Sequence, residues 1–152
     1  VLTRHLNWLP EHLGLNYLKL LLLLEQENLD ILCLQETWVA TGAAAPVLEG
    51  FYLVEQRRPN GTRGGLATYI RKPLKVETSS GNEYCLHTKI ILPNSQRINI
   101  VNIYIPPMTS LTKRNILETH ATTQVETILD NIQPQLITLV CGDFNARIGS
   151  SI

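Results

Sequence analysis

The chain has 152 residues, of which 44% are hydrophobic and 17% are charged, and its formal net charge is zero. This composition is typical of one globular domain and excludes a disordered chain, while a neutral balance gives no argument of its own for nucleic acid binding. The leucine-rich stretch 18–24 is far shorter than the ~20 apolar residues of a membrane span, and no secretory signal is visible. We therefore expect an intracellular protein without a membrane partner.

The first elements predicted along the chain are a helix and a buried strand. Leucines in a Lys, Glu and Gln background predict an amphipathic helix over residues 14–28 that packs on a sheet. Its predicted inward stripe consists of Leu15, Leu18, Leu21, Leu22 and Leu24. Four apolar residues, 31–34, then predict a buried strand, and Gln35, Glu36 and Thr37 follow at its carboxyl end. A buried strand therefore delivers the acid Glu36 to an edge of the sheet.

A hairpin is predicted over residues 52–71, with a turn at Asn60-Gly61 and a second strand that opens with Gly64-Gly65. A basic band with no acidic residue overlaps this hairpin. It contains Arg57, Arg58, Arg63, Arg71, Lys72 and Lys75. Such a band can bind phosphates through charge and counterion release, or it can be a solvated hairpin edge, where Lys and Arg are routine. Charge alone leaves both interpretations open.

The second half of the chain predicts another strand pair and a crossover unit. A turn is predicted at 79–82, and strands 84–92 and 98–105 are predicted to pair around Pro93-Asn94-Ser95. Asn102 and Tyr104 share one face of the later strand. A helix capped by Ser110 or Thr112 then runs to about Asn131, and its apolar stripe consists of Ile116, Ala121, Val125, Ile128 and Ile132. Because this helix leads to strand 136–141, the two strands should be parallel and end at the same edge.

Polar residues follow this last strand as well. Gly142, Asp143 and Asn145 come directly after it, and these residue types also form ordinary turns. Glu36 and Asp143, with nearby amide and phenol groups, suit Mg²⁺, which proteins hold through one or two carboxylates and which completes its shell with water and phosphate. His and Cys spacing for zinc is absent, and the three cysteines, Cys33, Cys85 and Cys141, are predicted to be buried and reduced. The pattern favours metal-assisted phosphoryl transfer over surface carboxylates at strand ends.

Four motifs carry a resemblance to a known family. They are LCLQET (32–37), GGLATYIRK (64–72), NIYIPP (102–107) and GDFNARIG (142–149). In this order they resemble the endonuclease/exonuclease/phosphatase superfamily. Within it, the QET-W, Y-PP and GDFNAR variants look most like the target-site endonuclease domain of jockey-type non-LTR retrotransposons, which nick chromosomal DNA to prime reverse transcription.

The resemblance implies a DNase-like, four-layer α/β/β/α sandwich and cleavage of double-stranded DNA that depends on Mg²⁺ or Mn²⁺. It further implies a nuclear location and, in the full element, a fused reverse transcriptase. By motif, Glu36 would bind the metal, Tyr104 would touch the scissile phosphate, Asp143 would orient or activate the water, and Asn145 would help to hold the phosphate or Asp143. The candidate phosphate-binding residues are Arg57, Arg58, Arg63 and Asn102.

Two departures from the family pattern limit what the resemblance implies. Asn7 stands where the family has an Asn that supports the metal, but LTRHLNWLP lacks the apolar strand that precedes it there. None of the four histidines lies in the family's carboxyl-terminal Ser-Asp-His motif. We therefore expect residues 1–152 to form the amino-terminal part of the domain, with apolar strand faces and a sheet edge uncovered.

Two alternatives remain open at this point. The first is a catalytically inactive module that binds nucleic acid or protein through the basic band, which the absent His favours. The second is a superfamily phosphatase that acts on a phospholipid or an inositol phosphate. The jockey-like motif variants weigh against the phosphatase, and the retention of Glu36, Asp143 and Asn145 weighs against the inactive module.

Overall fold

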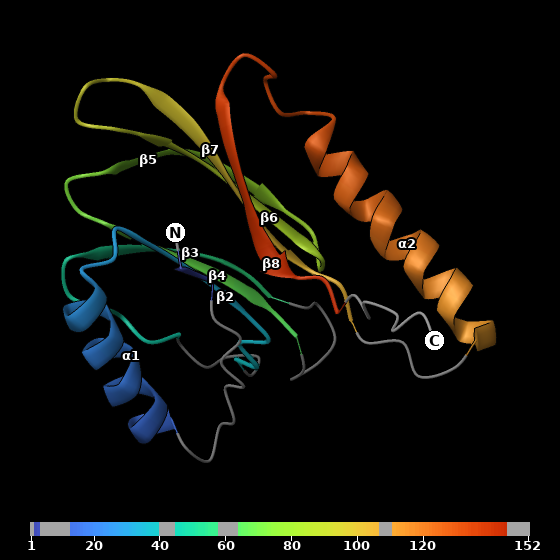
Figure 1. Cartoon of the computed structure of the whole chain (residues 1–152), viewed down its shortest axis with the longest axis horizontal. Coiled ribbons are helices and arrows are strands. Elements are labelled where there is room, and N and C mark those ends of the chain that lie inside the picture. The colour runs from blue at the N-terminus through green and yellow to red at the C-terminus, as the bar shows by residue number, and fades with distance from the viewer. Residues whose placement is uncertain (1, 4–12, 40–44, 58–63, 107–110, 146–152) are drawn as a thin grey trace, which may run out of the picture.

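A computed structural model describes residues 2–3, 13–39, 45–57, 64–106 and 111–145 of the chain. Two four-stranded sheets pack face to face, and one helix lies on the outer side of each sheet (Figure 1). This arrangement is a four-layer α/β/β/α sandwich and confirms the predicted fold class. Neither described helix is both long enough and apolar enough to cross a membrane.

The first sheet has the order β1-β2-β4-β3, and α1 covers its outer face (Figure 1). Its elements are β1 (Leu2–Thr3), α1 (Leu13–Glu27), β2 (Ile31–Gln35), β3 (Phe51–Gln56) and β4 (Leu66–Arg71). β3 and β4 form the predicted antiparallel hairpin, and β1 runs parallel to β2. The predicted helix stripe is wrong at Leu22, which is 54% exposed, whereas Leu20 and Leu24 are buried against the sheet. An unbroken leucine run has no periodicity from which the inward face could be chosen.

The second sheet has the order β5-β6-β7-β8, and α2 covers its outer face (Figure 1). Its elements are β5 (Lys75–Gly81), β6 (Cys85–Ile91), β7 (Arg97–Tyr104), α2 (Leu111–Leu129) and β8 (Ile137–Asp143). β7 and β8 are parallel and α2 connects them, as the sequence predicts. The turn predicted at 79–82 is misplaced, because residues 79–81 belong to β5. β5 is a polar edge strand, so it lacks the apolar pattern that marks a buried one.

Apolar side chains fill the three interfaces between the four layers. The central one lies between the sheets and contains Ile31, Cys33, Ile70, Ile90, Ile98, Ile100 and Cys141. All three cysteines are free and buried, as predicted. A hydrogen bond to the Cys141 thiol, followed by burial, raises the pKa of the Cys33 thiol well above its ordinary value. Cys33 on β2 therefore stays a neutral thiol against Cys141 on β8.

The two edges of the second sheet differ in chemistry. The β5 edge is polar and its pairing with β6 is irregular between Val76 and Thr78, which is how natural sheets protect an exposed edge. The β8 edge instead presents Ile137 and Val140, which are 54% and 53% exposed. This confirms the expectation of an uncovered apolar strand for β8, whereas the apolar strands β2 and β7, expected to be uncovered as well, are buried. In the described part of the chain no strand pairs with the outer side of β8.

Candidate active site

The carboxyl ends of β2, β7 and β8 meet at one edge of the sandwich. Gln35, the last residue of β2, donates from Nε2 to Oδ1 of Asn102 on β7 over 2.6 Å, across the two sheets. Tyr104 and Asp143 are partners in the parallel register of β7 and β8. The fold therefore brings Glu36, which follows Gln35, to the same end of the molecule as Tyr104 and Asp143.

The Glu36 carboxylate is held by the start of the β4 segment and by its own loop. The Glu36 side chain is 9% exposed, and its Oε2 accepts hydrogen bonds from the Gly64 amide (3.2 Å) and from the Trp38 indole Nε1. In addition, the Trp38 amide donates to the Gly64 carbonyl over 2.9 Å. The loop after β2 is thus fixed against Gly64 through both its backbone and its acid.

Glycine is required where these segments meet. Gly64 and Gly65 have φ values of 83° and 95°, which L side chains rarely adopt. A Cβ atom on Gly65 would lie 2.5 Å from Oγ1 of Thr37. The sequence predicted only a strand opened by two glycines and missed their contact with the loop of Glu36. The paired glycines were the signal for such a close approach.

Asn102 lies inside the protein, between the two sheets. It is fully buried, and its Nδ2 donates to the carbonyls of Leu34 and Ala67, each over 3.1 Å. Together with the bond from Gln35, this amide joins β7 to two strands of the other sheet. Its placement favours a structural role over the predicted phosphate contact.

Asp143 ends β8, and the turn that follows it is tied to the end of β7. Oδ1 of Asp143 accepts the Asn145 amide over 3.0 Å, and Nδ2 of Asn145 donates to the Ile105 carbonyl over 2.6 Å. Gly142 lies so close to β7 that a Cβ atom there would be 2.0 Å from the Ile103 carbonyl oxygen. This segment therefore forms a turn and also places the Asp143 carboxylate at the edge.

Tyr104 is 8% exposed and packs against Leu66 and Leu86 between the sheets. Its backbone amide donates to the Tyr84 carbonyl over 2.9 Å. The phenol is therefore anchored in the core at the end of β7 next to the candidate site.

The predicted basic band does not form one surface. Arg57 follows β3 at the end of the first sheet near Glu36, because Gln56 and Gln35 are both register partners of Leu66. Arg71 and Lys72 lie at the opposite end of β4, where Arg71 donates from Nε to the Leu29 carbonyl over 2.8 Å. The band is therefore split between the two ends of one strand.

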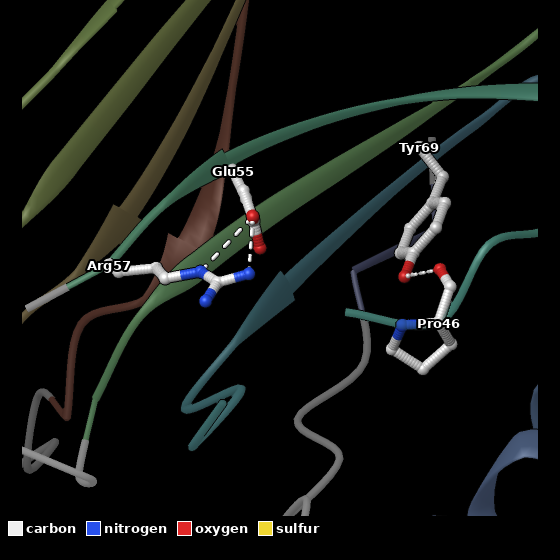
Figure 2. A network of polar contacts seen from close by, with 4 residues as sticks. All are labelled: Pro46, Glu55, Arg57 and Tyr69. Carbon is white, nitrogen blue, oxygen red and sulfur yellow. Dashed lines mark hydrogen bonds and ion pairs between the residues drawn. The ribbon is translucent and has the colours of Figure 1, made fainter. Parts of the chain in front are cut away.

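Arg57 also has an acidic partner. Its Nη2 lies 2.7 Å from Oε1 of Glu55, which is two residues earlier in the chain and just outside the band (Figure 2). The same view shows Tyr69 of β4, whose Oη donates to the Pro46 carbonyl over 2.8 Å (Figure 2). The other predicted site residues, Asn7, Arg58 and Arg63, lie outside the described residues.

The donor atoms at this edge fit a hard divalent cation. Within the described ranges, no three His, Cys, Asp or Glu side chains converge as a ready metal cluster. Mg²⁺ and Mn²⁺ do not need one, because one or two carboxylates can suffice when water and substrate oxygens complete the shell. Glu36 and Asp143 supply carboxylate oxygens of this kind, and the thiols of Cys33 and Cys141 lie deeper, in the core between the sheets.

Solved structures with the same fold include nucleic acid enzymes. The chain is similar to an AP endonuclease, LMAP, from Leishmania major (20% identity, TM-score 0.70, covering 93% of this chain and 53% of that one). It is also similar to a humanized TDP2 of D. rerio (12% identity, TM-score 0.69, covering 96% of this chain and 62% of that one). A third similar structure is the 3′ phosphatase NExo from Neisseria bound to a product DNA hairpin (18% identity, TM-score 0.62, covering 94% of this chain and 56% of that one).

These identities establish the fold alone, and the chain spans only 53% to 62% of the length of those three structures. No curated protein matches the sequence. The family itself is established by the sequence, because residues 12–151 match the Endonuclease/Exonuclease/phosphatase family, and this range contains Glu36, Tyr104 and Asp143. The chain therefore belongs to the Endonuclease/Exonuclease/phosphatase family.

Proposed function

We propose that the chain is the amino-terminal part of a Mg²⁺-dependent endonuclease that nicks double-stranded DNA for a jockey-type retrotransposon. The observation that carries the proposal is the convergence of Glu36 and Asp143, from different sheets, at one edge of the sandwich. The family membership supports phosphodiester or phosphomonoester chemistry at that edge. The QET-W, Y-PP and GDFNAR motifs support the retrotransposon context, with a fused reverse transcriptase and a nuclear location.

The residues at this edge have different roles in the proposed reaction. Glu36 offers a carboxylate oxygen to the cation, while Asp143 orients or deprotonates the attacking water. Tyr104, anchored in the core, contacts the scissile phosphate. Asn145 acts on Asp143 rather than on phosphate. Its backbone amide donates to the Asp143 carboxylate, and its side-chain amide already donates a hydrogen bond to the Ile105 carbonyl. When bound, Mg²⁺ neutralises charge on the phosphodiester and stabilises the leaving oxygen.

DNA approaches the site over the end of β3. Arg57 follows β3 at this end, and Arg58 and Arg63 stand in the sequence between β3 and Gly64, so their charge attracts the phosphates that flank the scissile bond. The salt bridge to Glu55 reduces the positive charge that Arg57 offers and holds its guanidinium in place. The DNA hairpin bound to NExo supports the choice of DNA as the partner.

A phosphatase is the second candidate function, because NExo shares this fold and is a 3′ phosphatase. A binding module without catalysis is the third, because no histidine of this chain lies in a Ser-Asp-His motif. The endonuclease breaks a phosphodiester bond, the phosphatase breaks a phosphomonoester bond, and the binding module breaks neither.

A substrate panel with Mg²⁺ separates these functions. The substrates are supercoiled plasmid, a DNA hairpin with a 3′ phosphate, and an inositol phosphate. A longer gene product that continues into a Ser-Asp-His segment should nick the plasmid and leave both phosphomonoesters intact. The 152-residue chain should bind the plasmid and nick it at least about 100-fold more slowly, since a positioned acid or base contributes about 10² to 10⁴. Release of inorganic phosphate without nicking would replace the proposal with the phosphatase.

A further inference from the structure

The Trp38 side chain reaches back to the acid that precedes it by two residues. Its indole Nε1 donates to Oε2 of Glu36, the same oxygen that accepts the Gly64 amide. Neither bond involves Oε1, the other oxygen of the carboxylate. The two donors thus distinguish the two oxygens by holding one of them in place.

The backbone of this loop is shaped to make that bond. Glu36 and Trp38 have φ values of 55° and 48°, in the left-handed region that residues other than glycine seldom occupy. Such conformations persist where the surrounding structure holds them, and they cluster at functional sites. Here the holding contacts are the bonds from the Thr37 and Trp38 amides to the Gly65 and Gly64 carbonyls.

Orientation matters for a carboxylate that binds a hard cation. A free Glu side chain samples several rotamers, so part of its binding free energy is lost in fixing one of them. Groups that hydrogen-bond to a metal-binding carboxylate remove this cost, and their loss typically lowers metal affinity about 10- to 100-fold. A neutral donor such as an indole N–H can hold the oxygen without adding a charge that repels the cation.

We infer that Trp38 is a positioning residue: its indole N–H fixes one oxygen of Glu36 so that the other oxygen faces a divalent cation. This inference rests on the proposed function for the metal role of Glu36, whereas the bond between Trp38 and Glu36 can be tested without it. A merely structural Trp38 would act through its ring. A Trp38→Phe variant retains a smaller aromatic ring and removes the N–H donor.

The experiment compares the full chain with Trp38→Phe, Glu36→Gln and Tyr69→Phe. The last variant is the matched control, because it also removes one aromatic donor from the first sheet, at the Pro46 carbonyl (Figure 2). The probe is Mn²⁺ alone, and the free ion is measured by electron paramagnetic resonance. We expect Trp38→Phe to weaken Mn²⁺ binding about 10-fold and Tyr69→Phe to leave it unchanged.

A second readout tests the hydrogen bond itself. In a Trp8→Phe background Trp38 is the only tryptophan, and Glu36→Gln should change its fluorescence whereas Glu49→Gln should not. Unchanged fluorescence in the Glu36 variant overturns the inference, even if Trp38→Phe fails to fold. Wild-type Mn²⁺ affinity in a folded Trp38→Phe variant also overturns it. If Glu36→Gln changes the fluorescence and leaves Mn²⁺ affinity intact, the bond stands, and the metal role of Glu36 fails together with the positioning role.

Discussion

Gly142 sets the distance between β7 and Asp143, the last residue of β8. A Cβ atom at this position would lie 2.0 Å from the Ile103 carbonyl oxygen, and a backbone atom in a paired strand has no rotamer through which to move away. We predict that Gly142→Ala lowers the free energy of unfolding by roughly 3 kcal/mol, because overpacking forces the backbone to shift. Urea unfolding followed by circular dichroism measures the change.

Gly50→Ala is the matched control for this substitution. Gly50 also has a positive φ, of 79°, but a Cβ atom there would meet nothing within 4 Å. Gly50→Ala should lower the free energy of unfolding by only about 1 to 2 kcal/mol, because an L residue is strained in a left-handed conformation. Equal losses for the two variants would show that contact with β7 does not determine the cost at Gly142.

Cys85 gives a prediction for alkaline pH. Burial raises the pKa of its thiol from 9.0 to about 12. Between these two values the unfolded chain releases the proton and the folded chain keeps it, so stability is unaffected below about pH 9 and falls as the pH rises above it. Unfolding free energies at pH 8 to 10.5 should therefore fall more steeply for the wild type than for Cys85→Ala, by up to about 1.4 kcal/mol per pH unit. Parallel pH profiles would contradict this reading of the thiol.

Among the elements, β8 is an edge strand with the composition of an interior one. Its exposed positions include Ile137 and Val140, and β5 on the opposite edge is polar. Uncovered apolar edges recruit other chains through backbone hydrogen bonds and burial. We predict that the 152-residue chain self-associates through β8 and that the double variant Ile137→Lys and Val140→Lys shifts it to a monomer in size-exclusion chromatography.

Two lysines placed on β5 provide the control for charge alone. Thr78→Lys together with Ser80→Lys adds the same charge at exposed positions of the other edge and should leave self-association unchanged. A wild-type chain that is monomeric, with no binding of a dye for apolar surface, would show that the β8 edge needs no cover.

For the molecule as a whole, the split of the basic band predicts where DNA lies. Arg57 is at the end near Glu36, and Lys72 and Lys75 are at the far end of β4. Reversing the charge of Arg57, Arg58 and Arg63 should weaken DNA binding and lower the slope of log K against log salt by up to about 0.9 per lost phosphate contact. Fluorescence anisotropy of a labelled duplex measures both quantities.

Charge reversal of Lys72 and Lys75 is the control, and it should leave the slope within error of the wild type. The same slope for both sets of variants would mean that the band acts only through net charge. A slope that changes only in the Lys variants would place the DNA at the opposite end of the sandwich.

Sequence patterns predicted the layers of this fold because apolar runs and helical periodicity mark strands and helices that pack in a core. The apolar run of β8 was also expected to be buried, which is wrong, because β8 is an edge strand with most of its side chains exposed or half-buried. The strands that became β2, β6, β7 and β8 were predicted from such runs, and the crossover helix followed from its spacing. β5 was missed because a polar edge strand buries too little to leave an apolar pattern. Leu22 was misassigned because neighbouring leucines made every face of the helix apolar.

The candidate site was predictable in part for a related reason. Polar residues at the carboxyl ends of apolar strands revealed Glu36 and Asp143, since position relative to a strand is a local property. Their partners were not predictable, because Gly64 meets Glu36 from 28 residues away and Asn102 meets Gln35 from 67 residues away. Asn102 also looked like a ligand because sequence alone does not distinguish a polar side chain in the core from one at the edge.

In the proposed function, Glu36 and Asp143 act together in one phosphodiesterase site. Nicking of supercoiled plasmid with Mg²⁺, by a longer gene product with the Ser-Asp-His segment, tests it most directly. Glu36→Gln and Asp143→Asn should each lower the nicking rate at least about 100-fold, with DNA affinity and circular dichroism unchanged and exposed Glu49→Gln fully active. Wild-type nicking by either site variant would contradict the claim.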